Sequence, residues 1–197
     1  MNIFTSLSHS FSTRVWSRAL HPPTLSSRVL ATSSSHAIRS QFSTASVLNM
    51  KVECQCGSVA FDTPQSAPLS VYHCHCTECQ KQSSSAFGTS AIFHADGIFP
   101  LSYDLKSKLN VWTRPAKENR SMDCYFCKEC GVRVMHRIRD ADGKERPTVS
   151  VKGGLVEGLD WSTAKHIFTR SAVVPIPAGA ERWEGTPEVM EGRPPQK

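Results

Sequence analysis

The sequence lacks a long apolar segment: nowhere in its 197 residues do roughly 18 consecutive apolar residues occur, the length that a membrane-spanning helix needs. It also lacks an internal repeat and a sustained heptad pattern. These absences exclude integral-membrane, coiled-coil and collagen-like proteins. The length and the mean hydropathy of -0.31 are typical of a soluble chain with a single domain.

The first part of the chain lacks acidic residues. Residues 1–50 contain four arginines but no lysine and no carboxylate, and the first acid is Glu53. Thirteen of residues 1–49 are serine, and apolar residues recur there at roughly helical spacing. We predict a mitochondrial transit peptide over residues 1–49, directing the protein to the matrix, or else a disordered serine-rich leader. Translation from Met50 would instead give a cytosolic form.

The rest of the chain has little net charge. Residues 51–197 carry 19 basic and 17 acidic side chains, so most of the total charge of +6 belongs to the leader. A balanced domain gives no electrostatic reason to expect nucleic-acid binding. Two basic runs, at 117–120 and 137–146, are interrupted by acids. They are expected to be solvated turns, with contact to a partner as the alternative.

Residues 50–185 are expected to form one mainly β domain, followed by a flexible tail at 186–197. Short alternating segments separated by turn residues are typical of a β-rich fold. Prolines break the chain at intervals too short for long helices, at positions 64, 68, 100, 115 and 147.

Alternating apolar residues predict individual strands within this domain. One hairpin is expected around Gly57, and a further strand over 69–76 leads into a short helix that Thr77 could cap. Another strand is expected over 132–138. It returns through a turn and pairs with a strand at 148–151.

Eight cysteines occur in three groups after the leader. The groups are Cys54-x-Cys56, Cys74-x-Cys76-x-x-Cys79, and Cys124 with Cys127-x-x-Cys130. Such close spacing projects several thiolates toward one point, as tetrahedral zinc requires. A disulfide framework is the alternative for an even number, but the mitochondrial matrix and the cytosol are both reducing. The pattern therefore favours bound metal, with zinc preferred over iron.

Two of the cysteine pairs have the form of zinc knuckles. Gly57 follows the first pair and Gly131 follows the second, and glycine permits the positive φ that turns backbone N–H groups toward the sulfurs. We predict one closed structural zinc site from both pairs, formed by Cys54, Cys56, Cys127 and Cys130. Such a site contributes roughly 10–16 kcal/mol of apparent binding free energy.

The remaining group is a trio, formed by Cys74, Cys76 and Cys79. It has no obvious fourth protein ligand, and three ligands with an open position are typical of a catalytic zinc. Two alternatives stay open. Cys124 could be the fourth ligand, or His73, His75 or another group could close the site. In a strand, both histidines would face away from the neighbouring cysteines.

Four short motifs follow one another along the domain. They are Cys54-Gln-Cys56-Gly57, Cys74-His-Cys76-Thr-Glu-Cys79-Gln-Lys, Ser85-Ala-Phe87-Gly88-Thr and Phe126-Cys127-Lys-Glu-Cys130-Gly131. Their order and spacing resemble the glutathione-dependent formaldehyde-activating enzyme family, which also includes centromere protein V. Weaker likeness continues through Lys152-Gly-Gly154 and His166-Ile-Phe168 to Trp183-Glu-Gly185. The chain departs from the family pattern at Ser84, where glycine is frequent, and in the extra thiol of Cys124.

The resemblance implies an Mss4-like β fold with two zinc ions per chain. One ion would be a structural zinc on the two knuckle pairs, and the other would be a second zinc on the trio, in agreement with the division reached from spacing. The resemblance also implies that the partner is a small thiol, namely glutathione or its adduct with an aldehyde.

The charge of the trio favours one kind of reaction. Zinc held by three thiolates is net negative, so it acidifies water less than zinc on three neutral histidines. A soft thiol is the better fourth ligand. We therefore predict a zinc-dependent carbon–sulfur lyase-type enzyme, in which a thiol such as glutathione fills the open position and adds to, or leaves, an aldehyde carbon. The alternative is a non-catalytic, zinc-stabilised protein-binding module.

Other residues around the trio carry weaker predictions. The proton shuttle is not identified, and His166, Glu78 and water are the candidates. The isolated His136 is expected to be structural. A cavity wall, or simply a polar loop, is expected from Ser83, Ser84, Ser85 and Thr89.

Overall fold

The computed structural model describes residues 49–187, and the structural statements below concern that range. The predicted leader at 1–49 and the predicted tail at 186–197 lie almost entirely outside the described residues. Within the described part, no helix combines the length and the apolar character needed to cross a membrane.

The described chain is mainly β, as predicted. Its strands are β1 (Lys51–Glu53), β2 (Ala60–Asp62), β3 (Ser70–Cys74), β4 (Gly88–His94), β5 (Leu109–Pro115), β6 (Ser121–Cys127), β7 (Arg133–Arg139), β8 (Thr148–Lys152) and β9 (Lys165–Ile167). Its helices are the short α1 (Thr77–Ser83) and α2 (Tyr103–Lys108) and the 3-10 turns η1 (Gly153–Leu155), η2 (Trp161–Thr163) and η3 (Thr169–Ser171).

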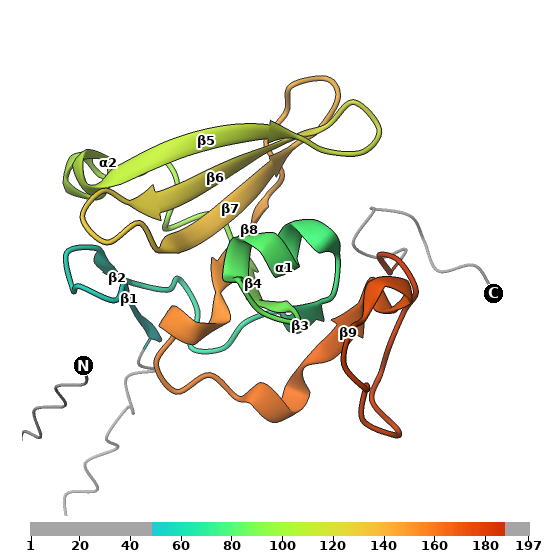
Figure 1. Cartoon of the computed structure of the whole chain (residues 1–197). Helices are drawn as coiled ribbons and strands as arrows, with labels where there is room; N and C mark the ends of the chain where they lie inside the picture. The colour runs from blue at the N-terminus through green and yellow to red at the C-terminus, as the bar shows by residue number, and fades with distance from the viewer. Residues whose placement is uncertain (1–48, 188–197) are drawn as a thin grey trace, which may run out of the picture. The chain divides into compact units, whose positions relative to one another are not determined.

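Seven strands form one sheet in the order β5-β6-β7-β8-β4-β3-β9, and β1 and β2 form a separate hairpin. Neighbouring strands of the sheet run antiparallel except for β3 and β9, which are parallel. In Figure 1 the sheet bends, so that strands β5, β6 and β7 lie on one side of α1 and the paired strands β3 and β9 lie on the other. The inner face of this bend carries the candidate site.

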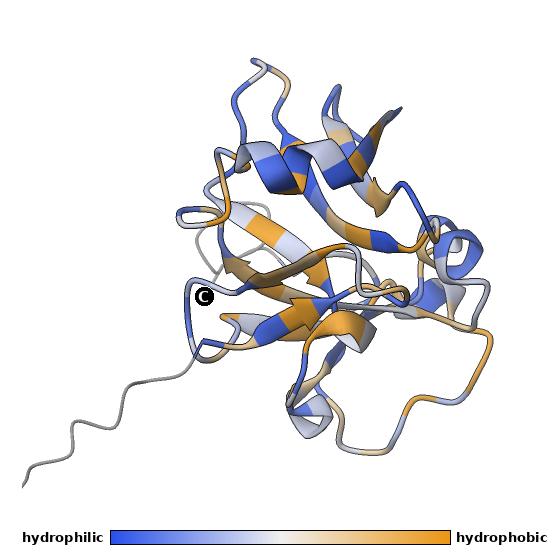
Figure 2. Cartoon of the chain, turned by 90° about the vertical axis from the view of Figure 1, so that its left-hand side faces the viewer, coloured by the Kyte–Doolittle hydropathy of each residue, from blue (hydrophilic) through white to orange (hydrophobic). Residues whose placement is uncertain are grey.

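Side-chain alternation divides the sheet into two faces. On β8, Val149 and Val151 belong to the main core, whereas Ser150 and Lys152 belong to the opposite face. Figure 2 shows hydrophobic and hydrophilic residues alternating along the strands. A smaller apolar cluster on the opposite face is formed by Tyr72, Cys74 and Ile167. One face therefore builds the core, and the other is free to build a site.

Several predicted elements are confirmed. β1 and β2 pair antiparallel on either side of Gly57, whose φ is +76°. β7 and β8 also pair antiparallel, in the predicted hairpin. The predicted cap of α1 was wrong by one residue, because the N-cap is Cys76 and not Thr77. The Cys76 sulfur accepts the hydrogen bond from the Cys79 N–H that a serine or threonine oxygen usually accepts.

The pairing of β5 with β6 was not predicted. The two strands pair over seven residue positions, from Leu109 opposite Cys127 to Pro115 opposite Ser121. β5 is one of the two edge strands of the sheet, and side chains such as Val111 and Trp112 are about half exposed on both faces. An edge strand of this kind lacks the clean apolar–polar alternation on which the prediction depended.

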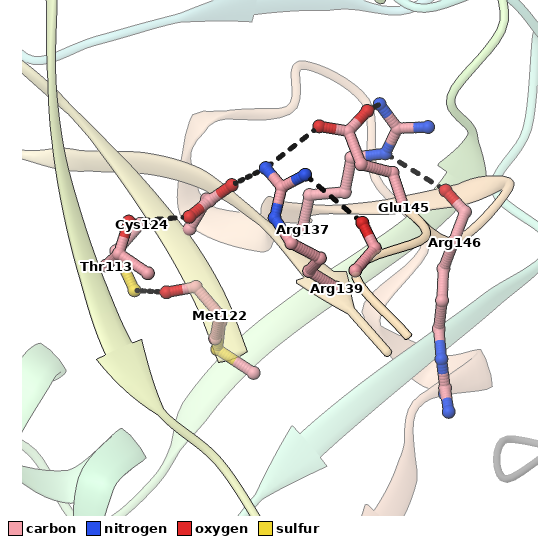
Figure 3. A network of polar contacts seen from close by, with 9 residues as sticks. Thr113, Met122, Cys124, Arg137, Arg139, Glu145 and Arg146 are labelled. Atoms are coloured by element: carbon pink, nitrogen blue, oxygen red, sulfur yellow. Dashed lines mark hydrogen bonds and ion pairs between the residues drawn. The ribbon is translucent and has the colours of Figure 1, made fainter. Parts of the chain in front are cut away.

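A polar network stabilises β5, β6 and β7 on the face opposite the candidate site (Figure 3). Asp123 is almost fully buried and accepts hydrogen bonds from Thr113 Oγ1 at 2.6 Å and from the Arg139 guanidinium at 2.8 Å. Arg139 also pairs with Glu145 at 3.1 Å, and Glu145 pairs with Arg137. The network therefore ties three strands to the turn that joins β7 and β8.

Candidate metal centre

The two knuckle pairs meet in space. The sulfurs of Cys54, Cys56, Cys127 and Cys130 lie within 4.8 Å of one another. The backbone explains this convergence, because Gly57 N–H donates to the Cys54 carbonyl and Gly131 N–H donates to the Cys127 carbonyl, each at 3.0 Å. Both glycines have the positive φ that such a tight turn requires.

The environment of this cluster favours a thiolate at Cys54 and at Cys130, whereas the neighbouring thiols raise the pKa of Cys56. Val59 N–H donates to the Cys54 sulfur at 3.2 Å, which stabilises negative charge on that sulfur. At Cys130 the pKa is lowered to about 6, first by the backbone N–H of Val132 and further by hydrogen bonds from Cys56 and Cys127. Cys54 and Cys127 are buried in the main core, so the cluster connects the β1–β2 hairpin to the end of β6.

The trio also converges. Cys74 ends β3, Cys76 caps α1 and Cys79 lies in the first turn of α1, and the three sulfurs lie within 4.8 Å of one another. Hydrogen bonds from the Cys74 and Cys79 thiols, and from the backbone N–H groups of Cys79 and Glu78, hold the pKa of Cys76 far below its usual value. The start of a helix thus presents its free N–H groups to a thiolate.

In the described range 49–187, no fourth histidine, cysteine or carboxylate joins the trio's group. Cys124, the first alternative fourth ligand, is fully buried in β6, and its thiol donates to the Met122 carbonyl at 3.6 Å. His73 and His75 are also outside the group, as strand alternation predicted. His73 pairs with Thr89 at 2.8 Å, and His75 pairs with His166 at 2.9 Å.

A cavity of about 660 Å³ opens against the trio. Its floor is the inner face of the sheet, where Ser90, Ile92 and Ser150 lie on the central strands β4 and β8. All three cysteines of the trio line it, together with Glu78 of α1. The four-cysteine cluster contributes no residue to this cavity. The two clusters therefore differ in their access to a small molecule.

Positive charge dominates the cavity lining. Six cationic side chains contribute, namely Arg114, Lys117, Arg120, Arg133, Lys152 and Arg170, against the two carboxylates of Glu78 and Glu118. Glu118 is already paired with Arg120 at 3.0 Å. Such a lining attracts anionic ligands, and each arginine can bind a carboxylate with two parallel hydrogen bonds.

Two buried polar groups on the cavity floor have no hydrogen-bond partner among the described residues: His136 Nδ1 and Lys152 Nζ. Burial lowers the pKa of His136 well below its usual value, and the nearby charges of Lys152 and Arg133 lower it further. Burial also lowers the pKa of Lys152, while the trio's Cys79 acts in the opposite direction. Buried polar atoms without partners indicate room for a ligand or water.

Of the two alternatives for the polar residues after the trio, the cavity wall was wrong. The expected wall residues do not line the cavity: Ser83, Ser84, Ser85 and Thr89. Ser83 instead donates to the Cys79 carbonyl at 2.7 Å and so stabilises the end of α1. The run 117–120 is a mostly exposed turn, as expected, and it also contributes to the rim of the cavity. His136 lies on the cavity floor, and its structural role stays a prediction.

The two side chains predicted as candidate proton shuttles differ in their access to the cavity. Glu78 lines the cavity, whereas His166 does not and is paired with His75. Lys152 was visible in the sequence only as part of the Lys152-Gly-Gly154 motif. Alternation along β8 places Lys152 on the same face as Ser150, but this indicates a site only when the order of the strands in the sheet is known.

These observations define a class of protein. It is a β-rich protein with two thiol clusters that could hold metal ions, one closed within the fold and one opening on a cation-lined cavity. All eight cysteines are free thiols, and four or three thiolates at such short separations are donor sets that suit zinc.

The family follows from comparison with known proteins. The model of the glutathione-dependent formaldehyde-activating enzyme family matches residues 49–171, which include both cysteine clusters. The chain belongs to this family. Glutathione-related aldehyde chemistry is accordingly the activity that the family suggests for the cavity.

Proposed function

We propose that the protein is a zinc-dependent carbon–sulfur lyase-type enzyme that makes and breaks adducts between a glutathione-like thiol and an aldehyde. One observation carries this proposal: the trio of sulfurs lies in the wall of a large cavity, and no fourth protein ligand joins it in the described range. Family membership supports the choice of thiol and aldehyde.

The two metal sites have different roles in this proposal. Cys54, Cys56, Cys127 and Cys130 would hold a structural zinc. Cys74, Cys76 and Cys79 would hold a second zinc, and the cavity beside them would admit the substrate thiol as a further ligand. When bound there, zinc would supply a lowered thiol pKa, so that the sulfur enters the reaction as a thiolate.

The cavity lining supports a glutathione-like thiol. Glutathione carries two carboxylates, and arginine guanidinium groups match carboxylates in geometry as well as charge. Arg114, Arg133 and Arg170 come from β5, β7 and η3, and all line the cavity that opens on the trio. The protein's own contribution would be to bind the carboxylates, to orient the thiol and to hold the aldehyde within reach.

The reaction balances without a redox partner. In the adduct-forming direction, the sulfur electron pair forms a carbon–sulfur bond with the carbonyl carbon. The π pair of the carbonyl moves to oxygen, which takes a proton and becomes the hydroxyl of a hemithioacetal. In the lyase direction, the hydroxyl loses its proton, the carbon–sulfur bond breaks and the thiolate leaves.

Exchange spectroscopy tests the proposal directly. Nuclear magnetic resonance can measure the rate at which labelled formaldehyde exchanges between its hydrate and its glutathione adduct. We expect the protein to raise this rate above the uncatalysed background, and Cys76→Ser to return it to background.

Cys124→Ala is the matched control, since Cys124 lies outside both clusters. It should keep two zinc ions and the parent exchange rate. Folded protein with two zinc ions and no acceleration would reject the enzyme and favour the protein-binding module.

A further inference from the structure

Lys152 is a buried cation that lines the cavity beside the trio and has no role in the steps given above. It is the last residue of β8, and only 7% of it is exposed. Its Nζ has no hydrogen-bond partner among residues 49–187. The neighbouring core residue, Val151, faces the other side of the sheet, so Lys152 belongs to the cavity face.

Gly88 places the Lys152 ammonium beside the trio. A Cβ atom at Gly88 would lie 3.3 Å from the Cys79 Cβ and 3.6 Å from Lys152 Nζ. Gly88 is also the register partner of Cys74 on β3. Cys74, Cys79 and the Lys152 ammonium therefore lie around Gly88, which has no side chain to separate them.

The burial of this ammonium is unfavourable in the absence of a partner. A buried donor without an acceptor forfeits its hydration, and the penalty is larger when the donor is charged. Methionine would fill a similar volume without that penalty. The position therefore suits a ligand that brings an oxygen acceptor with negative charge to the Lys152 side of the trio.

The proposed reaction develops such an oxygen. When sulfur adds to an aldehyde, negative charge accumulates on the former carbonyl oxygen, one bond away from the carbon under attack. We propose that Lys152 is a catalytic residue that donates a hydrogen bond, and then a proton, to this oxygen. This inference rests on the proposed function and adds the group that stabilises the oxygen.

The proton balance is complete. The thiol gives up its proton to solvent when it binds, and the Lys152 ammonium gives one proton to the alkoxide oxygen as the carbon–sulfur bond forms. Lys152 then recovers a proton from solvent through the cavity. In the lyase direction the steps run in reverse: Lys152 first releases a proton to solvent, and the neutral amine then takes the hydroxyl proton as the carbon–sulfur bond breaks. The leaving thiolate recovers a proton from solvent when it dissociates.

Two substitutions at this position, with a matched control, test the role. Lys152→Met removes the charge and the donor while keeping the length, and Lys152→Arg keeps the charge but moves the donors. Lys144→Met is the control, since Lys144 is an exposed lysine in the turn between β7 and β8. The measurements are the formaldehyde exchange rate, the zinc content, and calorimetric Kd values for glutathione alone and for the glutathione–formaldehyde adduct.

We expect Lys152→Met to lower the catalysed exchange rate by about 10²- to 10³-fold, the usual effect of losing one donor to a developing oxyanion. The Kd of glutathione alone should stay within about twofold of the parent value. The Kd of the adduct should rise about tenfold, which corresponds to roughly 1.4 kcal/mol for the loss of one hydrogen bond to the adduct oxygen. Lys152→Arg should recover part of the rate. Lys144→Met should match the parent throughout.

Three results would overturn the role of Lys152. If Lys152→Met loses the second zinc, or weakens glutathione and the adduct equally, the lysine is a counter-ion of the cysteine trio. If the parent accelerates exchange and Lys152→Met does so equally, Lys152 does not act on the oxygen, although the proposed function stands. A parent without acceleration rejects the proposed function, and this role with it.

Discussion

Replacing one cysteine in each cluster should reveal that the two metal sites stabilise the fold to different extents. Cys130 and Cys76 are both partly exposed, so serine at either position opens no cavity in the core. Cys130 belongs to the cluster that connects segments 71 residues apart, from Cys56 to Cys127. The trio, by contrast, lies within one short stretch of chain around the start of α1.

The difference can be estimated by treating each metal as a cross-link. The loop-closure relation gives about 4.4 kcal/mol at 25 °C for a loop of 71 residues. For the trio, with a loop of about five residues, the same relation gives about 2 kcal/mol. We therefore expect Cys130→Ser to destabilise the domain by roughly 2 kcal/mol more than Cys76→Ser, in addition to any difference in metal affinity.

Mass spectrometry under native conditions and chemical denaturation provide the assay. Each variant should retain one zinc ion, and the unfolding midpoint of Cys130→Ser should be the lower of the two. Cys124→Ala controls for the loss of a thiol outside the clusters. Equal destabilisation by the two serine variants, or a Cys130→Ser protein as stable as the parent, would refute the structural role of the four-cysteine cluster.

Two further predictions concern packing and pH. Gly153→Ala should lower the free energy of unfolding by about 1–3 kcal/mol in a denaturation experiment, because the new Cβ would lie 2.6 Å from the Thr89 methyl carbon. Gly154→Ala is the control: nothing lies within 4 Å of its Cβ, so the free energy of unfolding should change by less than about 0.5 kcal/mol. Because burial lowers the pKa of His136, the unfolded chain binds a proton there below about pH 6.5 that the folded chain does not, so stability falls as the pH falls. His136→Gln should flatten this slope by up to about 1.4 kcal/mol per pH unit between pH 6.5 and 5, and parallel slopes would contradict the assignment.

The cysteine clusters could be predicted because their geometry is largely local. Within each pair or trio, successive ligands are two or three positions apart, and a glycine after each knuckle sets the turn. The matching form of the two knuckles was enough to join Cys54 and Cys56 with Cys127 and Cys130 across the chain. The β1–β2 and β7–β8 hairpins were predictable for the same reason, since a turn determines each register.

The cavity could not be predicted, because its residues become neighbours only through the order of the strands. Arg114, Arg133 and Lys152 lie on β5, β7 and β8, and none of them is adjacent to another in sequence. Their convergence requires the unpredicted β5–β6 pairing and the bend of the sheet around α1. The polar serines after the trio suggested a wall, but the Ser83 hydroxyl and the backbone N–H groups of Ser84 and Ser85 instead bond carbonyls of α1.

Cadmium-113 resonance of the metal-exchanged protein tests whether the trio holds a metal that accepts a thiol, because each site gives its own signal. Cadmium is a soft ion that accepts the same thiolate ligands as zinc. We predict two signals, of which glutathione shifts only the one that Cys76→Ser abolishes. Two signals that both ignore glutathione, or the absence of the signal that depends on Cys76, would contradict a thiol-accepting metal at the trio.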